Sequence, residues 1–153
     1  MSLRLEDVMV SEVVTVDVDN TVAEAVKIMN EQEIGCLIVL NAAEKPVGIV
    51  TERDMLRRVL VKLRDPRKTK ISEIMSQPLI LGTPHMDVEV AARLMFKKKI
   101  KKLPVVENGN LVGLVTLTDL ARVQPEMIRI LKKLSMKQLA PKRIKKVIDY
   151  YVS

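Results

Sequence analysis

The sequence predicts an α/β protein in which two pseudo-symmetric β-α-β-β-α repeats pack sheet to sheet, with a helical extension at the C-terminus. The first observation behind this prediction is an internal repeat, because residues 5–9 (LEDVM) return as residues 71–75 (ISEIM). The second is that residues 48–54 (GIVTERD) return as residues 113–119 (GLVTLTD). The third is that the apolar spacing changes between strand and helix periods in the same order in both copies. A repeat of this length indicates two copies of one supersecondary unit.

The first copy opens with a strand and a helix. Residues 13–18 alternate in polarity, which predicts a short strand. Thr21 and Glu24 have the spacing of a capping box, which predicts a helix that begins there and runs to about Gln32. Its apolar residues have the spacing of a surface helix with one buried face: Val22, Ala25, Val26 and Met29.

The first copy continues with two strands and a second helix. The unbroken apolar run at residues 36–40 predicts a strand covered on both faces, and residues 47–50 predict the next strand. After Thr51 the apolar residues return to helical spacing as far as residue 63, and a polar linker follows at residues 64–70.

The second copy predicts the same order of elements. We expect strands at residues 79–81, 103–106 and 111–115, a helix at 88–98 capped by Asp87, and a helix from about Thr118. The resulting division is residues 1–66, 67–124 and 125–153 for the first repeat, the second repeat and the extension. Each repeat alone exposes an apolar sheet face, so the two should pack with approximate two-fold symmetry and form two equivalent clefts.

Composition limits the class of protein. A chain of 153 residues can bury a core without a disulfide or metal, and the single cysteine, Cys36, lies in an apolar run typical of a buried side chain rather than a reactive thiol. The charged N-terminus does not resemble a signal peptide, and no apolar stretch is long enough to span a membrane. We therefore expect a soluble, cytoplasmic protein.

The net charge of +7 is concentrated in the C-terminal extension. Its basic residues are Arg129, Lys132, Lys133, Lys137, Lys142, Arg143, Lys145 and Lys146, against Glu126 and Asp149. Beyond Pro141 an apolar stripe has helical spacing: Ile144, Val147, Ile148 and Tyr151. A basic amphipathic helix of this kind binds nucleic acid, an acidic partner or an anionic surface, or else packs on the body or across a dimer interface.

Each repeat closes on a threonine followed three residues later by an aspartate: Thr51 and Asp54, then Thr116 and Asp119. A carboxylate can accept hydrogen bonds from the two vicinal hydroxyls of a ribose, and a threonine at a strand-to-helix junction can share a phosphate with free helical N–H groups. The same spacing also caps a helix without any ligand. The residues alone leave both interpretations open.

Together these segments resemble a tandem pair of cystathionine-β-synthase (CBS) domains, also called a Bateman module. The resemblance covers about residues 5–122 and rests on the paired Gly-hydrophobic-hydrophobic-Thr-x-x-Asp segments and on the strand at residues 102–106 (KLPVV). It implies a non-catalytic sensor that binds AMP, ADP or ATP, or S-adenosylmethionine, in the clefts between the repeats. It further implies that Asp54 and Asp119 bind the ribose hydroxyls while Thr51 and Thr116 help to hold ribose or phosphate.

The resemblance also suggests further contacts, which differ between the copies. Lys101 and Lys102 stand where similar proteins often have a histidine or arginine that reaches phosphate, and Thr118 offers one more hydroxyl. Arg53 either binds phosphate or pairs with Glu52 or Asp54 on the surface. By analogy, the residues that enclose the adenine are Thr15, Ile34, Leu81 and Ile100.

The sequence offers little for catalysis. His85 is the only histidine, and we expect it at the surface or in a helix cap. The phosphate-binding and dinucleotide-binding glycine motifs are absent from the sequence, so binding without turnover is the expectation. Similar proteins form flat homodimers, and a regulated partner would be a separate chain. The alternative function is a protein-interaction or nucleic-acid-associated module that acts through its basic extension with empty clefts.

Overall fold

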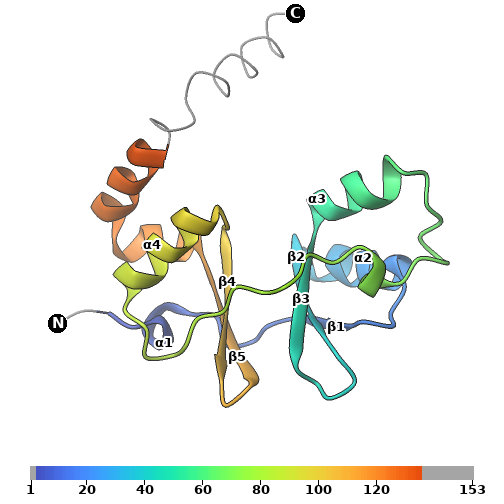
Figure 1. The fold of residues 1–153 in the computed structure, drawn as a ribbon, viewed down its shortest axis with the longest axis horizontal. Helices are drawn as coiled ribbons and strands as arrows, with labels where there is room; N and C mark the ends of the chain where they lie inside the picture. The colour runs from blue at the N-terminus through green and yellow to red at the C-terminus, as the bar shows by residue number, and fades with distance from the viewer. Residues whose placement is uncertain (1–2, 136–153) are drawn as a thin grey trace, which may run out of the picture.

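The computed structural model describes residues 3–135, and within them two repeats lie side by side (Figure 1). The first contains β1 (Thr15–Asp17), α2 (Val22–Gln32), β2 (Cys36–Leu40), β3 (Pro46–Thr51), α3 (Glu52–Asp54) and η1 (Met55–Leu60). The second contains α4 (Val88–Lys98), β4 (Lys102–Glu107), β5 (Asn110–Thr116) and α5 (Leu117–Val123), and a helix at residues 125–135 follows. Two short helices, α1 (Leu5–Val8) and η2 (Ile71–Glu73), open the repeats.

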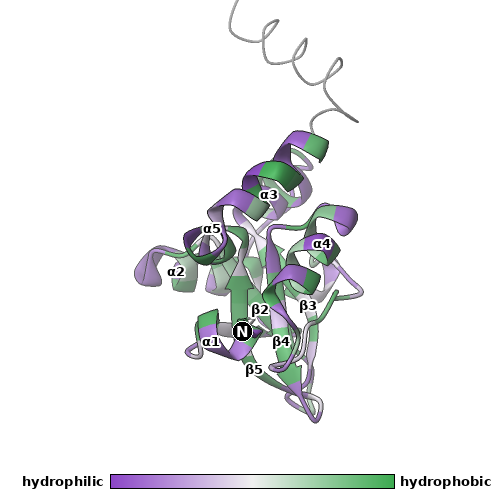
Figure 2. Ribbon diagram, turned by 90° about the vertical axis from the view of Figure 1, so that its left-hand side faces the viewer, coloured by the Kyte–Doolittle hydropathy of each residue, from purple (hydrophilic) through white to green (hydrophobic). Residues whose placement is uncertain are grey.

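The two sheets stand together in the centre of the molecule, and the helices lie on their outer sides (Figure 1). In the first repeat β1 runs parallel to β2, and β2 runs antiparallel to β3. In the second repeat β4 and β5 form an antiparallel pair. The strands are largely hydrophobic, while the helices alternate between hydrophilic and hydrophobic residues (Figure 2). This arrangement confirms the predicted α/β fold of two packed repeats.

The predicted strand at residues 79–81 is wrong: these residues form no strand in the described chain, and a single parallel bridge joins Gly82 to Val105 instead. In the first repeat, the Ile38 N–H donates to the Val14 carbonyl as β1 and β2 come together. The equivalent of Ile38 is Pro104, which has no N–H to donate. In the second repeat, Gly82 makes the two hydrogen bonds that remain. Its N–H donates to the Pro104 carbonyl, and its carbonyl accepts from the Val106 N–H.

The opening segment of each repeat packs against the other repeat. Val10 and Leu114 exchange two backbone hydrogen bonds of 2.9 Å, and Ile49 and Ser76 exchange an equivalent pair at 3.1 and 2.9 Å. Leu5 is fully buried in the hydrophobic core of the second repeat. The segment with the same sequence pattern, residues 71–75, contributes instead to the core of the first repeat. The crossing of these segments ties the two repeats together.

This exchange explains the glycine that begins each Gly-x-x-Thr-x-x-Asp segment. A Cβ atom on Gly48 would lie 2.6 Å from the sulfur of Met75, and one on Gly113 would collide with the sulfur of Met9. Both methionines belong to the exchanged segments. A side chain at either glycine would therefore push the opposite opening segment off the sheet.

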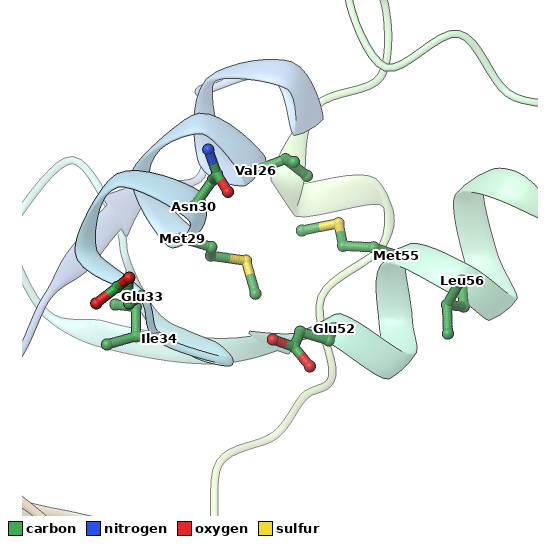
Figure 3. Close-up of a pocket in the computed structure, with 8 residues that line it drawn as sticks. All are labelled: Val26, Met29, Asn30, Glu33, Ile34, Glu52, Met55 and Leu56. Atoms are coloured by element: carbon green, nitrogen blue, oxygen red, sulfur yellow. The ribbon is translucent and has the colours of Figure 1, made fainter.

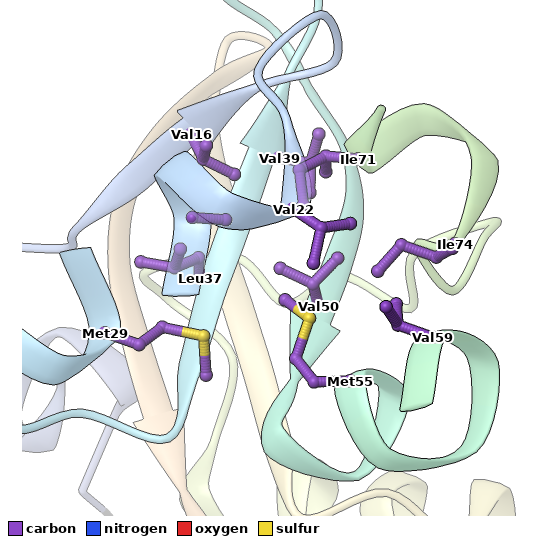
Figure 4. Close-up of a cluster of buried hydrophobic side chains, with 11 residues drawn as sticks. Val16, Val22, Met29, Leu37, Val39, Val50, Met55, Val59, Ile71 and Ile74 are labelled. Carbon is purple, nitrogen blue, oxygen red and sulfur yellow. The ribbon is translucent and has the colours of Figure 1, made fainter. Parts of the chain in front are cut away.

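Each repeat has its own core, made of valine, isoleucine, leucine and methionine. In the first repeat, Leu37, Val39 and Val50 from the sheet face Val22 and Met55 from the helices (Figure 4). Full burial of side chains of this size stabilises a fold by about 1.5–3 kcal/mol each. The predicted strands at residues 36–40 and 47–50 are confirmed as the centre of this core.

Helix α2 begins as the sequence predicts. The capping box is present: the Thr21 hydroxyl accepts from the Glu24 N–H at 3.1 Å, and the Glu24 carboxylate accepts from the Thr21 N–H at 3.1 Å. The helix after Thr51 is also present, but its second part, η1, widens to hydrogen bonds between residues five apart. It ends at Leu60, and in the turn that follows Leu63 has a left-handed φ of 55°.

The chain turns at Gln124 and continues as the helix at residues 125–135. Ile128 is only 2% exposed and belongs to the core of the second repeat, with Met127 and Leu131 packed against that core. The amphipathic stripe predicted beyond Pro141 lies outside the described residues. Within residues 3–135, no helix is long and apolar enough to cross a membrane.

Candidate functional site

Both threonine–aspartate pairs cap their helices in the same way. The Thr51 hydroxyl accepts from the Asp54 N–H at 3.3 Å, and the Asp54 carboxylate accepts from the Thr51 N–H at 2.9 Å. The second repeat repeats this geometry with Thr116 and Asp119 at 3.1 and 2.9 Å. The capping interpretation is therefore correct for the chain without ligand, and it places each hydroxyl and carboxylate together at a strand-to-helix junction.

The two aspartates differ in how strongly they are held by other groups. The second oxygen of Asp54 lies 3.8 Å from Nε of Arg58, and the Arg58 guanidinium also donates to the Ile74 carbonyl at 2.8 Å. Asp119 lies 3.9 Å from Nη1 of Arg122, whose side chain is 75% exposed. Asp54 is thus fixed within a network that includes the opposite segment, whereas the partner of Asp119 is free to move in solvent.

A cavity of about 140 Å³ lies between the repeats beside Thr116. The chain before β1 forms one wall, strand β2 forms the second, and strand β5 of the other repeat forms the third. Its lining residues are Val10, Glu12, Val13, Val14, Ile34, Cys36, Ile38, Leu114 and Thr116. Most of this lining is apolar, and Thr116 with Glu12 supplies the polar side chains. Such a slot suits a flat, largely apolar ring that carries polar groups at one edge.

A cation lies close to this cavity. Burial raises the pKa of the Cys36 thiol, and the positive charge of Lys102 opposes part of that rise. The thiol is therefore neutral at physiological pH. Lys102 is also the cross-strand partner of Thr116 in the β4–β5 ladder, so the two side chains lie on the same face of the sheet. The corner thus combines an apolar slot, a hydroxyl, a carboxylate and a positive charge.

The structure brings only some of the predicted site residues together. Ile34 and Thr116 line the cavity, and Asp119 and Lys102 lie next to Thr116. Thr15 lines a different depression of about 300 Å³ with Ser11, Asn110 and Leu111. The remaining predicted residues are not among those that line the cavity beside Thr116: Thr51, Arg53, Asp54, Lys101, Thr118, Leu81 and Ile100.

The sequence leaves two interpretations for Arg53, phosphate binding or a surface ion pair with Glu52 or Asp54. In the described chain, Arg58 and not Arg53 approaches Asp54. Arg53 is exposed on α3. Lys101 is also exposed, and its carbonyl accepts from the Leu117 N–H at 2.9 Å, which fixes the start of α5.

Sequence reasoning missed several cavity residues. Glu12, Val13 and Val14 come from the chain that crosses between the repeats, and Leu114 comes from the strand opposite. Their alternating apolar pattern was visible, but the same pattern describes a side chain that packs within its own repeat. Only the register of Val10 against Leu114 shows that the crossing chain closes the cavity.

Other reactive groups do not gather at this site. Among residues 3–135, no group of three or more histidine, cysteine, aspartate or glutamate side chains could hold a metal ion. His85 is exposed in the loop before α4, with Nδ1 3.5 Å from a carboxylate oxygen of Glu6. The arrangement beside Thr116 can bind a molecule through shape and hydrogen bonds.

Comparison with known proteins identifies the family from the same two repeats. The CBS domain family model matches residues 5–61 and again residues 71–126. The chain belongs to the CBS domain family. It is 38% identical over 117 residues to the CBS domain-containing protein YhcV of Bacillus subtilis, a match that covers 76% of this chain and 82% of the relative.

Solved structures of CBS proteins have the same fold. A conserved CBS domain protein of unknown function from Thermoplasma acidophilum superposes with a TM-score of 0.78 at 32% identity, covering 90% of this chain and 78% of that one. The CBS domain pair of protein MJ0100 superposes with a TM-score of 0.72 at 28% identity, covering 80% of this chain and 96% of that one. The MJ0100 structure is a complex with 5′-methylthioadenosine and S-adenosyl-L-methionine.

Proposed function

We propose that this CBS domain pair is a non-catalytic regulatory module that binds an adenine nucleotide or another adenosyl compound between its repeats. The observation that carries the proposal is the inter-repeat cavity whose wall holds Thr116, with the Asp119 carboxylate hydrogen-bonded directly behind it. AMP, ADP, ATP and S-adenosylmethionine share the adenosine group that this corner suits. The adenosyl ligands of MJ0100 support the same class of ligand.

In this proposal the adenine ring enters the apolar slot between Ile34, Val14 and Leu114. Asp119 accepts hydrogen bonds from the two ribose hydroxyls, which requires its carboxylate to turn from Arg122 or to share its lone pairs. Lys102 supplies a positive charge for a phosphate or another anionic group. The cavity of about 140 Å³ is smaller than typical ligand pockets of roughly 300–1,000 Å³, so side chains at its mouth move when the ligand enters.

We propose the cleft beside Thr116 as the working site, in preference to its pseudo-symmetric equivalent beside Thr51. In both positions one aspartate oxygen accepts from the threonine N–H and the other faces an arginine, but Arg58 beside Asp54 is also held by the Ile74 carbonyl, whereas Arg122 is 75% exposed. A ligand there would have to break a network that also holds the Ile74 carbonyl. Asp54, Thr51 and Arg53 thus have a structural role in this proposal, and Thr118 with Lys101 lies at the edge of the working site.

A sensor of this kind acts by favouring one arrangement of its two repeats. The ligand contacts both repeats at once, so it can shift that arrangement only as far as its affinities for the two states differ. The responding effector would be a separate protein. A cytoplasmic location remains a prediction from the sequence.

A thermal-unfolding screen tests this function. The chain is heated with AMP, ADP, ATP, S-adenosylmethionine or 5′-methylthioadenosine, and with GMP as a base-specificity control at matched ionic strength. A ligand at about one hundred times its dissociation constant adds roughly 2.7 kcal/mol to the free energy of unfolding. The proposal predicts stabilisation by at least one adenine compound and none by GMP. Equal responses to adenine and guanine compounds would contradict it.

A further inference from the structure

The end of η1 carries the most exposed apolar side chains of the described chain. Leu60 is 61% exposed, Val61 is 71% exposed and Leu63 is 92% exposed, the highest values among the large hydrophobic residues of 3–135. The helix formed by α3 and η1 carries them to the outer edge of the first repeat, where the chain turns back (Figure 1). We call residues 60–68 the η1 tip.

The η1 tip is separate from a groove that lies along the same helix. That groove, of about 590 Å³, lies between α2 and the α3–η1 helix, and Leu56 is one of the residues that line it (Figure 3). Leu60, Val61 and Leu63 are not among its lining residues. Their side chains therefore face solvent on a projecting turn and not inside a groove.

The second repeat buries the position equivalent to the apex of the tip. Leu63 and Ile128 stand equally far along the chain from the motif threonines, Thr51 and Thr116. Ile128 is only 2% exposed, because the chain turns at Gln124 and the helix at residues 125–135 packs on the core. The fold can thus cover an apolar side chain at this position, and the first repeat leaves it in water.

Hydrogen bonds hold the η1 tip in its projecting form. The Arg64 N–H donates to the Val59 carbonyl at 3.0 Å, and the Arg64 guanidinium donates to Glu73 at 2.6 Å. Leu63 has a left-handed φ of 55°, a conformation that leucine adopts rarely. Because Leu63 is almost fully exposed, no packing offsets this unfavourable conformation, and a role in binding accounts for it better than a role in the fold.

Basic side chains accompany these apolar residues. Between residues 57 and 68 the chain has six basic residues and one acidic residue, Asp65. Two of the six, Arg58 and Arg64, form ion pairs with carboxylates of the body. The other four are exposed and form no ion pair within residues 3–135: Arg57, Lys62, Arg67 and Lys68. The η1 tip therefore combines an apolar apex with positive charge that the described chain does not neutralise.

We propose that the η1 tip binds reversibly to an anionic membrane surface. Leu60, Val61 and Leu63 enter the boundary between lipid head groups and acyl chains, and the neighbouring lysines and arginines contact lipid phosphates. A nucleic acid would complement the charge but leave the three apolar side chains in water. A bilayer surface closes around a projecting tip from every side, and its negative charge complements the four unpaired cations. This inference does not depend on the proposed ligand.

Flotation of the full 153-residue chain with lipid vesicles tests the proposal. Vesicles of phosphatidylcholine are compared with vesicles that also contain about 30% phosphatidylglycerol, an anionic lipid. Wild-type protein should bind the anionic vesicles about tenfold more strongly, and added salt should weaken that binding. The combined variant Lys62→Gln, Arg67→Gln and Lys68→Gln should lose the preference for anionic vesicles.

Leu63→Asn separates membrane binding from folding. Asparagine adopts a left-handed φ more readily than leucine, so this variant should unfold at the same temperature as wild type or at a higher one. Its binding to anionic vesicles should fall about tenfold, because a large apolar side chain no longer enters the lipid. Val61→Asp should weaken binding as well. Val90→Asp is the matched control, since Val90 is 52% exposed on α4 outside the tip and should leave binding unchanged.

Two results would overturn the proposal. The first is that wild-type protein does not bind anionic vesicles; a lower sedimentation mass of Leu63→Asn than of wild type would then assign the tip to a contact with a second copy. The second is vesicle binding that survives both Leu63→Asn and Val61→Asp, which would assign the binding to basic residues elsewhere in the chain.

Discussion

The carboxylate of Asp119 caps helix α5, and in our proposal the same carboxylate also binds the ligand. It accepts from the Thr116 N–H at 2.9 Å, and one oxygen remains near the exposed Arg122. The helix cap therefore orients the carboxylate before any ligand arrives. Because the cap uses one oxygen and the other faces the exposed Arg122, which can move aside, capping is compatible with the proposed ribose binding in this repeat.

Alanine substitution of either motif aspartate should measure the cap alone when no ligand is present. Asp54→Ala and Asp119→Ala each remove the carboxylate that accepts from the N–H of the capping threonine. Each should therefore lower the free energy of unfolding by about 1 kcal/mol. Asp54→Ala should cost more than Asp119→Ala, since Asp54 is more buried and also faces Arg58. Urea denaturation of both variants checks the order. A larger loss of unfolding free energy in Asp119→Ala than in Asp54→Ala would contradict this order.

Cys36 reports on the cavity, because it lines the slot and is the only cysteine of the chain. Burial raises its pKa, so the thiol stays protonated at pH 7.5 and should react slowly with iodoacetamide in the folded protein. In urea the reaction should accelerate to the rate of an ordinary exposed thiol. A bound ligand should slow it further. A folded-state rate equal to the rate in urea would mean that the cavity wall is open.

For single residues, the sequence predicted the local role of a side chain better than it predicted which distant residues the side chain contacts. The Thr21–Glu24 cap, the buried Cys36 and the two threonine–aspartate pairs follow from local spacing, which a sequence displays directly. The approach of Glu12 and Leu114 to Thr116 depends on a crossing between repeats. The likeness of the two copies does not reveal such a crossing. The copies are equally similar whether an opening segment packs on its own repeat or on the other one.

Among the elements, helix α2 is anchored by the ionised Glu24. Hydrogen bonds from the Thr21 N–H, the Thr21 hydroxyl and the Asn20 amide lower the pKa of Glu24 below its ordinary value of 4.5. A lowered folded-state pKa means that the carboxylate stabilises the protein above the unfolded-state pKa. This contribution is lost as the pH falls through the folded-state pKa.

Glu24→Gln should therefore destabilise the protein more at pH 7 than at pH 3. Urea denaturation of wild type and variant at both pH values provides the comparison. The difference between the two proteins should shrink on acidification, because the wild-type carboxylate is then protonated as well. A difference that is constant or larger at pH 3 would show that the charge of Glu24 does not strengthen the cap.

The elements themselves were predictable where the apolar period was unambiguous. Strands β2 and β3 and helices α2 and α4 are present as expected from residues 36–40, 47–50, 22–32 and 88–98. The strand expected at residues 79–81 failed because Pro104 removes a donor on the neighbouring strand, an effect that lies outside the segment itself. The spacing of the apolar residues also does not predict that the turns of η1 widen to hydrogen bonds between residues five apart.

For the whole molecule, the exchanged opening segments make the repeats mutually dependent. Leu5 is fully buried among residues more than eighty positions away, including Val88 and Leu103. Leu5→Ala should lower the free energy of unfolding by about 2–5 kcal/mol, as expected for a large side chain lost from a core. Leu81→Ala, at an exposed leucine, should change it by no more than about 0.5 kcal/mol.

Urea denaturation followed by circular dichroism compares these two variants. If Leu5→Ala cost no more than Leu81→Ala, the N-terminal segment would not belong to the second core. The two-fold likeness of the repeats and the cleft between them were predictable from the repeat alone. The exchange was not, because the two copies are equally similar whichever repeat an opening segment packs against.

We propose that one adenosyl ligand binds between the repeats at the Thr116–Asp119 corner. Isothermal titration of wild type, Asp54→Ala and Asp119→Ala with the most stabilising adenine compound is the decisive test. Wild type should bind one ligand per chain, Asp54→Ala should keep the same stoichiometry, and Asp119→Ala should lose binding while it remains folded. Binding that survives in Asp119→Ala but disappears in Asp54→Ala would contradict this proposal and place the ligand in the opposite cleft.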